Sequence, residues 1–146
     1  MSTPDASPRS NRSIGWQRYA LIGIATVIAA VLANLVVYYI GSAIVGYDPE
    51  FVVLATPGGA ITFTLFPAIV AVIVYAILLG TTSNPARTFT IVAAVVLVLS
   101  LLPDLFYIPS VPGSSPAQTV VLMIMHVVAA VVIVTMLTNL ARPKHV

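Results

Sequence analysis

The charged residues of this chain lie at its two ends and in short segments that separate long uncharged runs. The first of these runs extends from Tyr19 to Tyr47, and a helix needs only about 20 apolar residues to cross a bilayer core about 30 Å thick. Of the 146 residues, 7% are charged and 60% are hydrophobic, whereas a soluble domain carries about 25% charged residues. The sequence therefore excludes an ordinary soluble domain and predicts a small polytopic membrane protein.

Proline- and glycine-containing loops divide the apolar sequence into four segments of spanning length. We expect a four-span membrane domain over residues 19–141, with spans at about 19–45, 60–80, 88–106 and 117–140. The short apolar piece Phe51–Ala55 lies between the first two spans, and the sequence leaves open whether it is interfacial or re-entrant. Residues 1–18, rich in Ser, Pro and Asn, predict a disordered cytoplasmic tail, and residues 142–146 predict a second tail.

The basic residues fix the expected orientation. With four spans, both termini and the middle turn share one side of the membrane, and that side holds all 6 Lys and Arg residues. Because Lys and Arg near span ends mark the cytoplasmic side, we expect both termini in the cytoplasm and the protein in the plasma membrane. Short connections imply antiparallel neighbours, so the predicted fold is all-α, an up-down-up-down transmembrane four-helix bundle.

Polar side chains inside the spans are the candidate functional residues, because burying them in lipid is costly. Depth along the spans places Asn34, Ser100, Asp104 and His126 in the half of the bilayer away from the cytoplasm. Helical spacing groups Ser100 with Asp104 on one face of the third span, and it assigns Met125 and His126 to different faces of the fourth. We expect these four polar residues to form one intramembrane cluster in which Asp104 and His126 share a hydrogen bond, directly or through a water molecule. Equally, amides and imidazoles join helices in membranes without any other role, so both readings stay open.

A small-residue stripe on the first span predicts the face that packs inward. Its members recur at spacings of three, four and seven: Gly23, Thr26, Ala30, Asn34 and Gly41. Small side chains allow helix backbones to approach closely. We therefore expect this face to lie against the other helices and to bring Asn34 into the bundle.

Several classes of chemistry lack their sequence signatures. The chain has no cysteine, which excludes disulfides and thiolate metal sites. It has no GxSxG, HExxH or phosphate-binding glycine loop, and its scattered basic residues give no nucleic-acid footprint. We expect no catalytic residues, no cofactor and no metal.

Four short segments resemble a bacterial family of small four-span membrane proteins that is known only as a domain of unknown function. The segments are Ala33–Tyr38, Pro57–Gly59, Leu99–Asp104 and Met125–Ala130. The resemblance covers about residues 18–142. It implies four spans and marks Asn34, Asp104 and His126 as signature positions, and it implies no activity.

Two functions fit these features. The first is a non-enzymatic multi-pass membrane protein, an accessory or structural component of the cell envelope, whose partners are the lipid bilayer and either a second copy of the chain or other membrane proteins. The second is a small oligomeric transporter or channel with a polar site in the outer half of the bilayer. The chain has no acidic residue near the middle of a span, and such a residue is the usual driver of proton-coupled export. The first function is therefore favoured.

Topology is directly testable. Reporter fusions after residue 114 and at the carboxyl terminus should report opposite sides of the membrane, with the carboxyl terminus cytoplasmic, because the basic residues determine orientation. A cytoplasmic signal from the fusion at residue 114 would contradict the four-span topology.

Overall fold

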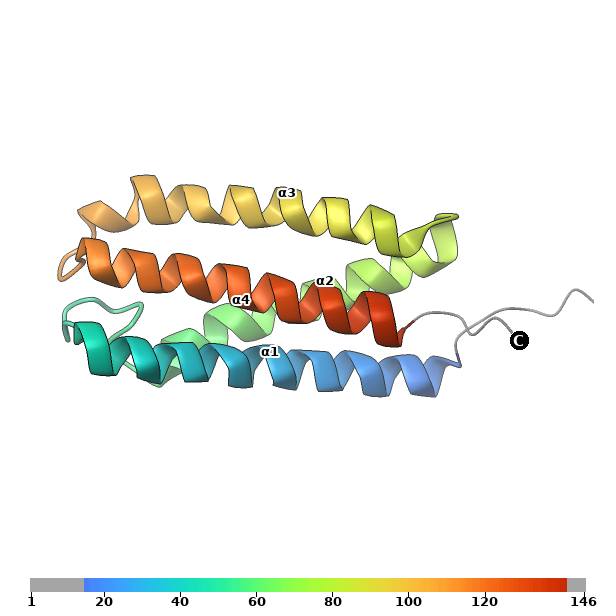
Figure 1. Ribbon diagram of the computed structural model, residues 1–146, viewed down its shortest axis with the longest axis horizontal. Helices are drawn as coiled ribbons and strands as arrows, with labels where there is room; N and C mark the ends of the chain where they lie inside the picture. Colours follow the sequence, from blue (N-terminus) through green and yellow to red (C-terminus); the bar gives the residue numbers. More distant parts are fainter. Residues whose placement is uncertain (1–14, 142–146) are drawn as a thin grey trace, which may run out of the picture.

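A computed structural model of the protein describes residues 15–141 as a bundle of four long helices (Figure 1). The helices are α1 (Trp16–Val45), α2 (Pro57–Thr81), α3 (Pro85–Phe106) and α4 (Pro116–Leu140), with the short 3-10 helix η1 (Ile108–Ser110) before α4. All four long helices are long and apolar enough to cross a membrane. The predicted all-α transmembrane bundle is confirmed, and the chain is a multi-pass membrane protein.

The helices begin a few residues before the predicted spans. The first residue of each of the last three helices is a proline: Pro57, Pro85 and Pro116. Proline is favoured there because the first turn needs no N–H donor. The side chains of Asn84 and Ser115 cap two of these helices by accepting from the N–H of the third helical residue. The predicted spans follow the limits of the apolar sequence, whereas the helices begin at their capping residues. The helices therefore start before the spans.

The predicted tails fall mostly outside the described residues. Residues 1–14 and 142–146 are not described, so the expected disorder of both tails stays a prediction for them. Residues 16–18 belong to α1 instead of the tail, because the helix continues beyond the apolar run. Trp16 stacks on Tyr19 in this first turn.

The four helices do not all touch one another. Figure 1 shows α4 between α1 and α3, with α2 crossing behind them. Helix α1 packs mainly on α4 and α2, whereas α3 packs mainly on α4 and more sparsely on α2. Within residues 15–141, α1 and α3 make no contact. These two helices therefore occupy opposite corners of the bundle.

The small-residue face of α1 points inward. All five residues of the predicted stripe are buried, which confirms that expectation. At Gly23 an added Cβ would lie 2.8 Å from Val72 Cγ1 of α2, so the absence of a side chain permits this approach. Ala30 is fully buried farther along the same face.

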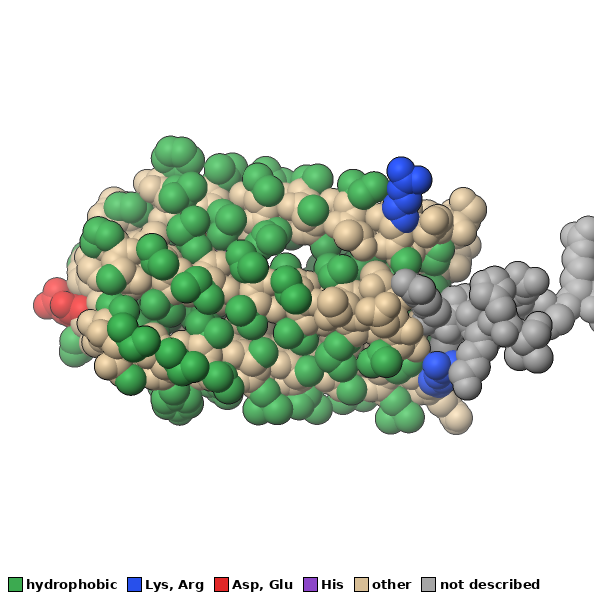
Figure 2. Space-filling model, viewed as in Figure 1, with side chains coloured by type: hydrophobic (Ala, Val, Ile, Leu, Met, Phe, Trp, Pro, Cys, Tyr) green, Lys and Arg blue, Asp and Glu red, His purple; other side chains and the backbone are tan. Residues whose placement is uncertain are grey.

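Charged side chains gather at the two ends of the bundle (Figure 2). Among the described residues, Arg18 and Arg87 mark one end, called here the basic end, where Arg18 donates to the carbonyl of Leu140. Asp48 and Glu50, in the loop after α1, mark the opposite or acidic end. This distribution is the one that the predicted orientation requires.

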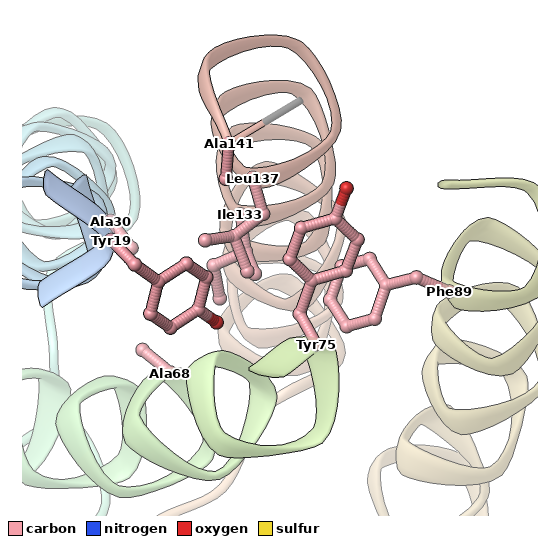
Figure 3. Close-up of a cluster of buried hydrophobic side chains, with 8 residues drawn as sticks. All are labelled: Tyr19, Ala30, Ala68, Tyr75, Phe89, Ile133, Leu137 and Ala141. Atoms are coloured by element: carbon pink, nitrogen blue, oxygen red, sulfur yellow. The ribbon is translucent and has the colours of Figure 1, made fainter. Parts of the chain in front are cut away.

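A buried aromatic and aliphatic cluster holds the basic half of the bundle together (Figure 3). Tyr75 of α2 and Phe89 of α3 meet edge to face with ring centroids 5.0 Å apart, a favoured aromatic geometry. The hydroxyl of Tyr19 in α1 donates to the carbonyl of Val72 in α2. Helix α2 is thus joined to both α1 and α3 in this half.

The loop after α1 caps the acidic end. Phe51 and Leu54 are fully buried there, so the piece Phe51–Ala55 packs onto the bundle. The Tyr38 hydroxyl donates to the Leu54 carbonyl over 3.1 Å, and the Tyr47 hydroxyl donates to the Tyr38 carbonyl over 2.9 Å. Burial, together with the neighbouring Tyr38, raises the pKa of Tyr47. At Gly59 a side chain would collide with the carbonyl of Val53, so glycine permits the loop to fold back on α2.

Enlarging the inward face of α1 should destabilise the bundle. Ala30→Leu adds volume where no space exists and should lower the free energy of unfolding by about 1–3 kcal/mol. Ala25→Leu makes the same change on the exposed face of α1 and should alter it by less than about 0.5 kcal/mol. Reversible unfolding in mixed micelles measures both. Equal effects of the two substitutions would contradict the packing of this face.

Candidate functional site

A cavity of about 450 Å³ lies between α2, α3 and α4. Small side chains line it where these helices would otherwise meet: Ala93 on α3, and Ala129 and Ala130 on α4. Figure 2 shows an opening between α3 and α4 near the middle of the molecule. The α3 residues that line the cavity, among them Val92, Ala93 and Val96, lie in the middle turns of that helix.

The cavity wall is apolar except toward the acidic end. Its four polar side chains come from all four helices: Asn34, Thr64, Ser100 and His126. Aromatic and branched aliphatic residues form the rest, including Phe63, Phe66 and Val96. Pro67, inside α2, also lines the cavity. An apolar chamber with a few polar groups at one end is the usual composition of a small-molecule site.

The side chains of Asp104 and His126 are in contact. Nδ1 of His126 lies 3.1 Å from Oδ2 of Asp104 and 2.9 Å from the carbonyl oxygen of Leu122. The hydrogen bond of Nδ1 is directed at Leu122, and Oδ2 of Asp104 has no hydrogen-bond partner in the described chain. The Asp104 side chain is buried behind the ring, while the His126 ring borders the cavity. The contact therefore fastens α3 to α4 at the acidic end.

Asn34 stands apart from this pair. Its Nδ2 donates to Oγ1 of Thr64 over 2.8 Å, and the Thr64 hydroxyl donates in turn to the carbonyl of Ala60 over 2.7 Å. Asn34 cannot reach Asp104 because α1 and α3 occupy opposite corners of the bundle. Asn34 thus joins α1 to α2.

The structure divides the four predicted site residues. Asp104 and His126 are in contact, but Oδ2 of Asp104 has no hydrogen-bond partner in the described chain. Ser100 donates to the carbonyl of Leu97 in its own helix over 2.7 Å. Asn34, Ser100 and His126 border the same cavity without bonding to one another in the described residues. The expected single hydrogen-bonded cluster is therefore replaced by one pair and two side chains around a common space.

The structure adds two features of the site to the sequence analysis. Met125 and His126, which we expect on different faces of the helix, both line the cavity, and Met125 is buried. The reason is that α4 is the central helix and packs on α1, α2 and α3, so more than one of its faces is buried. Thr64 was not predicted as a partner of Asn34. The available signal was their similar depth in adjacent spans.

The described residues bring no three His, Asp or Glu side chains together as a metal site. Asp104 and His126 offer two ligands at most. Chemically, the arrangement supplies an apolar chamber with polar atoms at one end and an imidazole that faces the chamber.

Residues 15–143 match a family of unknown function, DUF6069. The chain belongs to this family. No curated protein and no solved structure matches the chain. The match covers all four helices, the cap and the cavity, so the bundle described here is the fold of a DUF6069 protein. It also agrees with the resemblance seen in the sequence.

The effects of substituting Asp104 and His126 on the free energy of unfolding should not be additive: the two single substitutions together should cost more than the double substitution. His126→Leu leaves a buried carboxyl group without its neighbour, so His126→Leu and Asp104→Leu should show a coupling free energy of about 0.5–3 kcal/mol in a double-mutant cycle. The readout is the free energy of unfolding in micelles. The matched cycle between His126→Leu and Ser100→Ala should give coupling near zero, because Ser100 bonds within its own helix. Additive effects of the first two substitutions would rule out an energetic pair.

Proposed function

We propose that this DUF6069 protein is a non-enzymatic plasma-membrane protein that holds a small apolar molecule in its cavity, as an accessory component of the cell envelope. The observation that carries the proposal is the cavity between α2, α3 and α4. Its volume of about 450 Å³ falls within the range of about 300–1,000 Å³ that is usual for small-molecule sites.

The lining supports binding in preference to catalysis. A nucleophilic hydroxyl needs a base within hydrogen-bond reach, whereas the Ser100 and Thr64 hydroxyls donate to carbonyls of their own helices. The imidazole of His126 directs Nδ1 to the Leu122 carbonyl. These hydrogen bonds support a site that binds a molecule without catalysing a reaction on it.

The charge distribution supports the proposed orientation. Arg18 and Arg87 at one end, and Asp48 and Glu50 at the other, follow the rule that basic residues stay cytoplasmic. In this orientation both termini are cytoplasmic, and the polar part of the cavity lies in the outer half of the bilayer.

The contact between Asp104 and His126 favours a second candidate, a small oligomeric transporter that moves protons through this pair. A carboxyl group beside an imidazole is suited to proton transfer. Toward the basic end, however, the cavity is lined by Phe89, Ile133 and Val134, which offer no ligand to a proton or an ion. Proton flux into proteoliposomes that is abolished by His126→Leu would favour this candidate.

Filling the cavity should abolish binding. Hexadecane with a mid-chain diazirine should, on irradiation in lipid nanodiscs, label the cavity residues of α2, α3 and α4. Ala93→Trp places an indole in the cavity and should reduce this labelling about tenfold, since the ring takes up part of the free volume and obstructs a chain that lies along the cavity. Circular dichroism checks that the variant is folded.

Val95→Trp is the matched control, because Val95 is on the same helix and is 54% exposed. It should leave labelling of the cavity unchanged. Labelling spread evenly over lipid-facing residues, and insensitive to Ala93→Trp, would contradict binding in the cavity.

A further inference from the structure

Each polar side chain of the cavity directs one hydrogen into the protein. The Thr64 hydroxyl donates to the Ala60 carbonyl, and the Ser100 hydroxyl donates to the Leu97 carbonyl. Asn34 donates through Nδ2 to Thr64 Oγ1. Since the Thr64 hydrogen is already directed to Ala60, its oxygen can only accept from Asn34, and this fixes which end of the amide is the carbonyl.

His126 follows the same pattern. Two oxygens, the Leu122 carbonyl and Asp104 Oδ2, lie within 3.1 Å of Nδ1. A nitrogen that faces two acceptors carries a hydrogen, because a lone pair would be repelled by both. In the neutral ring Nε2 is therefore an acceptor.

Besides the second hydrogen of Asn34 Nδ2, these residues leave acceptor atoms for a ligand. The clearest is Oδ1 of Asn34, which has no hydrogen-bond partner in the described chain and belongs to a cavity-lining residue only 3% exposed. Neighbouring side chains cover this oxygen, so one of them must shift for a ligand to reach it. A buried acceptor without a donor costs free energy, so a molecule that supplies one is favoured at this position. Ser100 keeps free lone pairs on the same cavity.

We infer that the cavity binds a long-chain membrane alcohol, whose aliphatic chain lies along the apolar walls of α2, α3 and α4 and whose hydroxyl donates to Asn34 Oδ1. This inference rests on the proposed function and specifies its ligand. The hydroxyl matches a site that accepts hydrogen bonds, and the chain matches the rest of the lining.

The charges of the lining disfavour the other common head groups. A phosphate or a carboxylate is favoured by cationic donors, and the described residues that line the cavity include neither Lys nor Arg. An ammonium group is favoured by a carboxylate in contact, and Asp104 is not among the described lining residues. An alcohol is neutral, so its binding does not require a partner of opposite charge in the cavity.

Competition against the diazirine probe tests the head group in the full-length protein. The competitors are hexadecanol, hexadecyl methyl ether and hexadecyl phosphate, which share one chain. The ether keeps the oxygen but lacks the donor. Because a single hydrogen bond is gained, hexadecanol should protect the cavity at a concentration about fivefold to tenfold lower than the ether.

Asn34→Leu should abolish this preference by weakening protection by hexadecanol to the level of the ether. Asn139→Leu is the matched control, since Asn139 is exposed and donates to the Thr135 carbonyl of its own helix; it should keep the preference. If Asn34→Leu does not fold, the comparison of alcohol and ether on the unaltered protein still decides the question.

Each outcome has a definite meaning. Equal protection by hexadecanol and the ether overturns the inference but leaves binding of an apolar chain intact. Stronger protection by hexadecyl phosphate also overturns it and indicates a donor in the site, such as a protonated His126. Failure of all three competitors to protect, together with probe labelling that ignores Ala93→Trp, overturns the proposed function itself.

Discussion

A hydrogen-bond donor inside a bilayer must find its acceptor within the protein, because lipid offers none. In this bundle most hydroxyl side chains do so on their own helix, as Thr26 does with the carbonyl of Ile22 four residues earlier. Side-chain bonds between spans are fewer; Tyr19 to Val72 and Asn34 to Thr64 join α1 to α2. The helices are consequently held together mainly by the fit of their surfaces, and the small-residue face of α1 sets how closely α2 and α4 approach it.

These hydrogen bonds within single helices determine which polar atoms the cavity offers to a ligand. A hydroxyl that donates to a carbonyl of its own helix has used its only hydrogen but keeps its lone pairs. Such hydroxyls in the cavity wall can therefore accept hydrogen bonds from a ligand but cannot donate to it. The open space itself has a different origin. Helix α3 meets α2 through Phe89 near one end and α4 through Asp104 near the other, and small residues such as Ala93 face the interval between these contacts.

The sequence predicts the fold well because its main determinant is local. The lengths of the uncharged segments, together with the positions of the basic residues, specify how many spans there are. The spacing of small residues such as Gly23 and Ala30 specifies which face of α1 is buried. The site depends on which helices are neighbours, and no single span contains that information. Asn34 was grouped with Asp104 because both lie at similar depth, yet they belong to helices at opposite corners. The burial of Met125 likewise depends on the central position of α4, which packs on the three other long helices.

The open space beside the middle turns of α3 has a mechanical consequence. A helix that borders a cavity has fewer packed neighbours on that side to resist a force applied from the lipid. The bilayer exerts such force as lateral pressure, and this pressure varies with lipid composition. The cavity beside α3 is therefore the part of the bundle whose volume such pressure would change first.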